Sequence, residues 1–169
     1  MKNILYVNAC VKRDVDSRTN RLAQAYLKKS LETHSCSLSV INLEDTVMLP
    51  LTGKSLAERE KAIANNDFSG ASFDLARNFA AADEVVIAAP YWDMSFPASL
   101  KLYMEQLCVN KLTFYYNEKG MPCGLTNIKK VVYLTTSGGY IGKNNFVFDY
   151  INGLFSTLFG IDEIYFFSA

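Results

Sequence analysis

A cluster of large apolar side chains follows a strand-like run of the sequence. Residues 85–88 are Val-Val-Ile-Ala, and the next few positions bring Tyr91, Trp92, Met94 and Phe96. Connecting loops run over the surface and are usually polar, so four such side chains need a flat apolar surface to cover. That surface is an aromatic ligand, the protein's own core or a partner chain.

Hydroxyl and basic side chains gather where a helix is expected to begin. Ser17, Arg18 and Thr19 place hydroxyls, backbone amides and a cation at this N-terminus. The first amides of a helix have no partner within it, and together with the helix dipole they favour an anion such as phosphate. Ordinary capping of the helix by Asp16 or Ser17 explains the same residues.

Two adjacent glycines follow another strand-like run. Ser137, Gly138 and Gly139 let the backbone come close to a ligand and direct amide groups at its polar edge. A simple turn accounts for the glycines about as well. Each of these three groups is weak evidence alone, but a shared position in the fold makes a common site the stronger interpretation.

The pattern of apolar residues predicts alternating strands and helices in one domain, residues 1–169. We expect strands at residues 3–8, 38–43, 84–89, 130–136 and 161–167, and helices at about 17–33, 54–66, 72–82, from Pro97 onward and at 145–159. Residues 112–125 indicate a loop or small hairpin. This alternation predicts a flavodoxin-like, doubly wound α/β fold with a five-stranded parallel sheet of order 2-1-3-4-5. Its winding reverses between strands 1 and 3, and ligands bind at the carboxyl ends of the strands there.

Together, the three groups of residues describe a site for a phosphorylated planar ring. The first suits a phosphate, the second offers flat apolar side chains, and the third offers backbone amides. FMN fits this description better than ATP or NAD alone. The dinucleotide fingerprint G-x-G-x-x-G is absent after the first strand, and Met48 replaces the first glycine that LTGKS would need in a Walker loop. The G-x-S-x-G elbow of serine hydrolases is also absent.

Composition and charge argue against several classes of partner. The chain has 169 residues, half of them hydrophobic, and 17 basic residues balance 17 acidic ones. A neutral chain without a basic block is a poor partner for nucleic acid or for an anionic membrane. No apolar run approaches the ~20 residues that span a bilayer, and the start of the sequence lacks a signal-peptide pattern. One histidine and four scattered cysteines form no metal motif and indicate free thiols in a reducing cytoplasm.

The sequence resembles the FMN-dependent NAD(P)H:quinone oxidoreductases and azoreductases of the flavodoxin-like fold. The resemblance runs from the first strand to the last and is carried by DSRTNRLA, by LTFYYNEKG followed by GL, and by KKVVYLTTSGG. The most specific run is FDLARNFAAADEVVIAAPYWDMSFPASLK. It joins a strand, Pro90, the aromatic loop and a helix begun by Pro97 in one fixed spacing.

The resemblance implies an FMN site. Ser17 and Thr19 would hold the phosphate, with Arg18 between them and Cys10 nearby. The isoalloxazine ring would lie along the aromatic loop, whose members are Pro90, Tyr91, Trp92, Asp93 and Met94, with backbone amides reaching its polar edge. The opposite side would be held by Ser137, Gly138 and Gly139. Tyr140 would border the pocket. The family is usually homodimeric with both sites at the interface, so Phe114 in the LTFYY segment would help cover the neighbouring flavin.

The implied reaction is a ping-pong hydride transfer. NADH or NADPH would reduce the FMN and leave, and a quinone, azo compound or similar flat acceptor would then take the electrons at the same face. The flavin carries this chemistry, so we nominate no side-chain acid or base. Tyr140 and Tyr115 are possible proton donors, but packing is the favoured role for each. The sequence does not distinguish NADH from NADPH.

Three departures from the family pattern bear on this interpretation. Members of the family often have serine at the position of Cys10, and the cysteine would weaken a phosphate contact. Many members have asparagine at the position of Asp93, and the aspartate carboxylate would lower the flavin's reduction potential. The sequence also stops directly after the last strand, where members continue into a helix. We therefore expect part of one sheet face to be bare, either because the sequence is incomplete or because another subunit covers it.

Two other classes of function remain open. A flavodoxin-type electron-transfer module would be strongly acidic and would carry a tight phosphate loop directly after strand 1. The neutral charge and the long loop at residues 9–16 argue against it. A flavin-free interaction protein is favoured only if the short C-terminus prevents cofactor retention.

Overall fold

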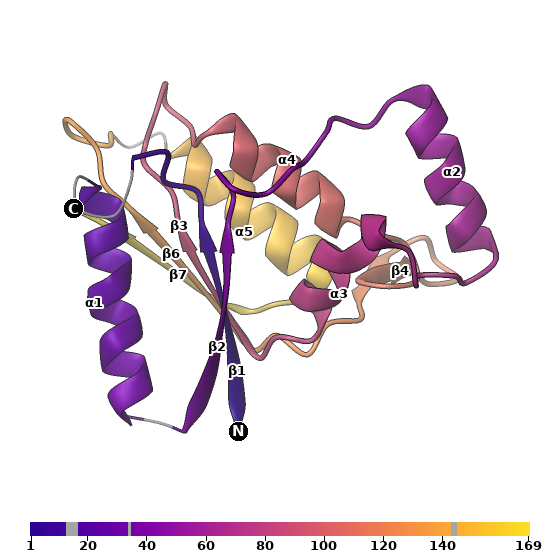
Figure 1. Cartoon of the computed structure of the whole chain (residues 1–169), viewed down its shortest axis with the longest axis horizontal. Coiled ribbons are helices and arrows are strands. Elements are labelled where there is room, and N and C mark those ends of the chain that lie inside the picture. The colour runs from indigo at the N-terminus through magenta and orange to yellow at the C-terminus, as the bar shows by residue number, and fades with distance from the viewer. Residues whose placement is uncertain (13–16, 34, 143–144) are drawn as a thin grey trace.

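A five-stranded parallel sheet forms the centre of the protein in the computed structural model, which describes residues 1–12, 17–33, 35–142 and 145–169 (Figure 1). The strand order is β2-β1-β3-β6-β7, and every neighbouring pair is parallel. The strands are β1 Lys2–Asn8, β2 Cys36–Asn42, β3 Glu84–Ala88, β6 Lys130–Thr135 and β7 Glu163–Ser168. The predicted doubly wound sheet and its strand order are confirmed.

Helices cover both faces of this sheet (Figure 1). Helix α1 packs on one face, where Ala23 and Leu27 join a buried cluster with residues of β1, β3 and β6. Helices α3, α4 and α5 pack on the other face. Cover on both faces explains the continuous apolar character of β3, whose five residues are all buried. The helix bounds are α1 Arg18–Thr33, α2 Gly53–Ala64, α3 Asp74–Ala80, α4 Ala98–Leu107 and α5 Phe146–Phe159, with a short 3-10 helix η1 at Ala71–Phe73.

The predicted hairpin forms beside the main sheet. Strands β4 Phe114–Tyr116 and β5 Pro122–Gly124 pair antiparallel. The Asn117 side chain accepts hydrogen bonds from the amides of Lys119 (2.9 Å) and Met121 (3.0 Å), which closes the turn. Gly120 has a φ of 72°, a conformation that suits glycine.

Gly124 allows the hairpin to pack against the end of α5. A Cβ at this position would lie 1.8 Å from the carbonyl oxygen of Phe159. Because backbone atoms cannot move aside as a side chain can, Gly124→Ala is expected to lower the free energy of unfolding by about 1–3 kcal/mol. Denaturant unfolding measures this. Gly153→Ala in α5 is the matched control, since its Cβ would meet no atom within 4 Å. Equal unfolding midpoints for Gly124→Ala and the wild type would refute the packing argument.

The sheet face under α1 is wider than the helix. Leu38 and Val40 of β2 lie beside buried β1 residues, and Tyr165 and Phe167 of β7 lie beside buried β6 residues. All four are partly exposed, with Val40 at 51% and Phe167 at 47%. Apolar surface is therefore exposed on both edge strands of this face, at Leu38 and Val40 of β2 and at Tyr165 and Phe167 of β7. Among the described helices, none is long and apolar enough to cross a membrane.

Candidate functional site

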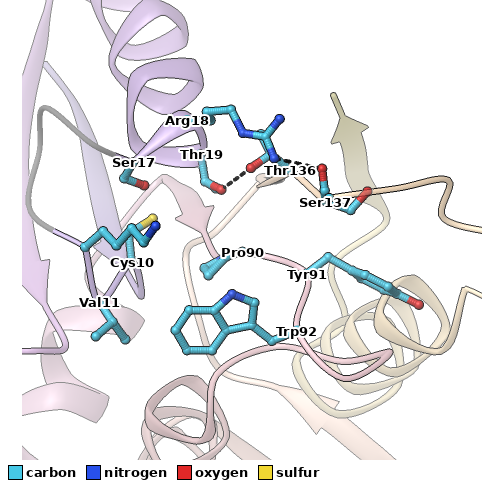
Figure 2. A pocket seen from close by; sticks show the side chains of 12 residues that line it. Cys10, Val11, Ser17, Arg18, Thr19, Pro90, Tyr91, Trp92, Thr136 and Ser137 are labelled. Atoms are coloured by element: carbon cyan, nitrogen blue, oxygen red, sulfur yellow. Dashed lines mark hydrogen bonds between the residues drawn. The ribbon is translucent and has the colours of Figure 1, made fainter.

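The three groups identified in the sequence meet at the carboxyl edge of the sheet. The loops after β1, β3 and β6 line one cavity of about 170 Å³ (Figure 2). Of the predicted residues, this cavity is lined by Cys10, Ser17, Arg18, Thr19, Pro90, Tyr91, Trp92, Ser137 and Gly138. The cavity lies at the reversal of winding between β1 and β3, where doubly wound folds bind ligands.

The N-terminus of α1 forms one wall of the cavity. The Ser17 hydroxyl accepts a hydrogen bond from the Asn20 amide at 3.1 Å, so the capping interpretation is correct for Ser17. The alternative cap, Asp16, lies outside the described residues. Capping uses the oxygen of Ser17 as an acceptor and leaves its proton for a second partner. Capping and anion binding are therefore compatible at this residue.

Two contacts tie this helix end to the loop after β6. The Arg18 guanidinium donates to the Ser137 carbonyl at 2.9 Å, and the hydroxyls of Thr19 and Thr136 lie 2.7 Å apart. Figure 2 shows both contacts above the cavity, facing Pro90 and Trp92. The Arg18 fork has further N–H donors beyond this one bond, so its charge remains available to an anion.

The aromatic loop has two half-buried and two exposed apolar side chains. Tyr91 and Phe96 pack against the main core, and the Phe96 ring lies 5.6 Å from that of Tyr150. Trp92 and Met94 are 43% and 57% exposed. The core-packing alternative therefore holds for Tyr91 and Phe96, while Trp92 presents its indole to the cavity (Figure 2).

A tight turn sets the direction of Trp92. The Trp92 amide donates to the Ser95 carbonyl at 3.0 Å, and the Ser95 amide donates back at 2.7 Å. Between them, Asp93 and Met94 have φ values of 50° and 61°. Both central residues of a type I′ turn have positive φ, which aspartate tolerates and methionine does not favour. The positive φ therefore gives a conformational reason for an aspartate or asparagine at position 93.

Relieving this backbone strain gives a direct test of the turn. Met94→Gly is expected to raise the free energy of unfolding by about 1 kcal/mol, because glycine adopts a positive φ without a Cβ clash. Thermal unfolding of the cofactor-free protein measures the change. Asp93→Gly should have a smaller effect, since aspartate already tolerates this conformation. A Met94→Gly protein less stable than the wild type would contradict this description of the turn.

The aromatic loop offers fewer free amides than expected. The Tyr91 amide donates to the Thr136 carbonyl at 3.0 Å, and the Trp92 amide is used in the turn. Within the described parts of the chain, the backbone bonds between loops and turns include none from the amides of Asp93 and Met94. Only these two of the four predicted loop amides are thus left for a ligand's polar edge.

Some predicted residues lie away from the cavity, and some lining residues were not predicted. Phe114 is 7% exposed and belongs to the main core, where its ring lies 5.5 Å from that of Tyr116. Tyr140 is 91% exposed, and neither it nor Asp93, Met94 or Gly139 lines the cavity. The unpredicted lining residues are Val11, Lys12 and Thr136. Lys12 is a basic residue in the loop after β1. Its positive charge close to Ser17 and Arg18 in the sequence was a signal that could have predicted it as a further anion-binding residue.

Three tyrosines have a raised pKa and keep their phenol protons near neutral pH. Burial raises the pKa of Tyr103 and of Tyr133, so both phenols stay protonated near neutral pH. The hydrogen bond with Cys123 raises the pKa of Tyr115, on the hairpin and outside the cavity. None of these three is poised to lose a proton.

The fold and the cavity together define a doubly wound α/β protein with a ligand site at its winding reversal. A family profile described as flavodoxin-like fold matches residues 2–169. An FMN-dependent NADH:quinone oxidoreductase 2 of Clostridium perfringens (strain 13 / Type A) is 30% identical over 178 residues, or 97% of this chain and 83% of that protein. A protein of the same name from Clostridium acetobutylicum is 31% identical over 166 residues, or 95% and 80% of the two chains.

Solved structures agree on the fold. An azoreductase from Bacillus anthracis str. Sterne has a TM-score of 0.86 at 22% identity, covering 99% of this chain and 86% of that one. An FMN-dependent NADH-azoreductase from Bacillus anthracis str. Ames Ancestor, solved in complex with FMN, has a TM-score of 0.82 at 22% identity and the same coverage. The chain belongs to the flavodoxin-like fold family that includes the FMN-dependent NADH:quinone oxidoreductases.

Proposed function

We propose that this protein is an FMN-dependent oxidoreductase that takes hydride from NADH and reduces quinones, azo compounds or similar flat acceptors. The observation that carries the proposal is the meeting of a helix N-terminus, an exposed indole and a glycine-containing loop around one cavity. The names of the relatives support FMN as the cofactor and NADH as the donor.

The lining residues suit the two chemical halves of FMN. The phosphate would bind at the start of α1, near the Ser17 hydroxyl and the Arg18 guanidinium, where the helix dipole favours an anion. The ring would lie against Trp92, and the free amides of Asp93 and Met94 would serve its polar edge. Ser137 and Gly138 would hold the opposite side.

Bound FMN supplies the chemistry of accepting hydride and passing on electrons. The chain needs to position the ring and leave one face open for both substrates in turn. Trp92 is well suited to the first task because an aromatic side chain stacks on a flat ring. One shared open face supports a ping-pong order, in which NAD⁺ leaves before the acceptor binds.

A homodimer is part of this proposal. The hairpin exposes Tyr115, Tyr116 and Met121, with Tyr116 at 56%. Exposed aromatic and methionine side chains are enriched where proteins pack together, and these are close in sequence to Phe114. A second copy packing on the hairpin would bring it near the neighbouring cavity.

Steady-state kinetics test the reaction. The protein is loaded with FMN, passed through gel filtration and assayed with NADH and a quinone, each varied at fixed levels of the other. Parallel double-reciprocal lines are expected for a ping-pong order, whereas intersecting lines would refute that order. Loss of all flavin on gel filtration together with no NADH oxidation would refute the proposed function.

A further inference from the structure

Helix α2 stands apart from the other helices of its side of the sheet (Figure 1). None of its 12 residues is buried. Near its C-terminal end, Ala62 and Ile63 pack against a small buried cluster that contains Phe73 of η1. Along the rest of the helix, two cavities of about 630 and 560 Å³ lie between α2 and the body of the protein. The first borders η1 and α3, and the second borders α4 and the hairpin.

The side chain of Arg59 crosses the gap between α2 and α4. Arg59 lines both cavities, and its guanidinium donates to the carbonyls of Glu105 at 3.4 Å and Cys108 at 2.5 Å. Both carbonyls lie at the C-terminal end of α4, where carbonyls lack partners within the helix and a cation is favoured. Two further contacts across the gap are made in exposed positions, at 3.4 Å each, by Gln106 to the Leu49 carbonyl and by Lys111 to the Ile63 carbonyl.

The segment that carries α2 has a fixed point at each end. Before it, the Thr46 hydroxyl donates to the Asn42 carbonyl at 2.7 Å. After it, the Arg77 guanidinium of α3 donates to the Phe68 carbonyl. We call the residues between these points, 47–67, the α2 arm. Segments with few buried apolar groups open locally at a lower cost in free energy than the core does.

We propose that the α2 arm is a lid that opens and closes as a unit, and that Arg59 is the latch that holds it closed. Opening breaks the two bonds of the guanidinium to α4 and joins the two cavities into one groove along that helix. Neither cavity shares a residue with the proposed flavin site, so the latch is independent of the proposed function.

A role for Arg59 as a cap alone gives a different expectation. If the guanidinium only completes the last turn of α4, its loss loosens that turn and leaves α2 unchanged. If it is the latch, its loss exposes α2. A helix of 12 residues is marginal in water by itself, so the amides of α2 exchange with solvent when the arm is open. Hydrogen exchange therefore reports the opening of the arm.

The test follows amide hydrogen exchange in the whole chain by mass spectrometry. In the wild type, α2 is expected to exchange about 100-fold faster or more than β3, whose residues are all buried. Arg59→Met keeps an unbranched side chain without the guanidinium and should speed the exchange of α2 about 10-fold or more, the loss typical of a hydrogen bond to a charged group. Lys61→Met removes the same charge from an exposed position of α2 that lines neither cavity, and its exchange should stay within about 3-fold of the wild type.

Three results overturn the latch. Exchange of α2 as slow as that of β3 in the wild type would mean that the arm opens only with the whole fold. Faster exchange confined to the last turn of α4 in Arg59→Met would leave Arg59 as a cap. Equal acceleration of α2 and β3 would make Arg59 a residue of global stability. If Arg59→Met does not fold, Arg59→Lys replaces it, because lysine keeps the cation without the planar fork and should still speed the exchange of α2 selectively.

Discussion

Arg18→Glu is expected to weaken FMN binding roughly 10- to 100-fold, at about 1.4 kcal/mol for each factor of ten. The change removes a cation from the cavity wall and places a carboxylate at the start of α1, where the phosphate would bind. Two like charges about 4 Å apart near a protein surface repel by about 4 kcal/mol, and solvent and salt reduce this at an exposed residue. Titration of flavin fluorescence at two salt concentrations measures the effect, which should shrink at high salt.

Two matched variants isolate the charge. Arg18→Gln removes the cation without adding an anion and should lose less affinity than Arg18→Glu. Arg21→Glu makes the same reversal on an exposed residue of α1 that does not line the cavity, and it should bind FMN nearly as the wild type does. Unchanged FMN affinity in Arg18→Glu would remove this end of α1 from the phosphate subsite.

Glu84→Gln is expected to lower the free energy of unfolding by about 3 kcal/mol, the low end of the range for breaking a buried ion pair. The Glu84 side chain is 1% exposed at the amino end of β3. Its carboxylate accepts from Lys2 at 2.5 Å, from Lys130 at 3.0 Å and from the Tyr26 hydroxyl at 2.8 Å. The low end applies because both lysines are partly exposed and regain water when the carboxylate is lost.

The same carboxylate predicts a pH dependence of stability. Burial alone raises the pKa of Glu84, but hydrogen bonds from Lys2, Tyr26 and Lys130 outweigh it and hold the pKa below its ordinary value of 4.5. The unfolded state therefore takes up this proton first as the pH falls. The contribution of Glu84 is complete above about pH 4.5 and is lost as the pH drops through the folded-state pKa.

Denaturant unfolding at a series of acid pH values checks both statements. The difference in stability between the wild type and Glu84→Gln should be largest near neutral pH and should narrow below about pH 4.5. Glu118→Gln removes an exposed carboxylate from the hairpin turn and serves as the control, with little change expected. A difference between wild type and Glu84→Gln that widens toward acid pH would contradict the sign of this shift.

Local sequence patterns predicted the architecture because they depend on neighbours along the chain. The buried run of β3 and the glycine in the β4–β5 turn each reflect a single element's requirements, and the strand–helix alternation leaves few topologies. The convergence of the three loops followed from that topology. The two-sided burial of the sheet made β3 especially clear.

Contacts between distant parts of the chain were not predictable in the same way. The Thr19–Thr136 pair joins residues 117 positions apart, and the Glu84 cluster joins β3 to Lys2 across 82 positions. Neither leaves a periodic or local signal. Phe114 illustrates the same limit, because whether an aromatic residue fills its own core or projects outward depends on packing that the local sequence does not specify.

The account depends on a flat flavin ring lying against the indole of Trp92, and the chain itself contains the reporter. Trp92 is the single tryptophan, so emission excited where tyrosine does not absorb comes from the cavity alone. Titration with FMN is expected to remove most of this emission, with a break at equal amounts of cofactor and protein. Undiminished Trp92 emission from protein that has retained FMN through gel filtration would place the flavin elsewhere.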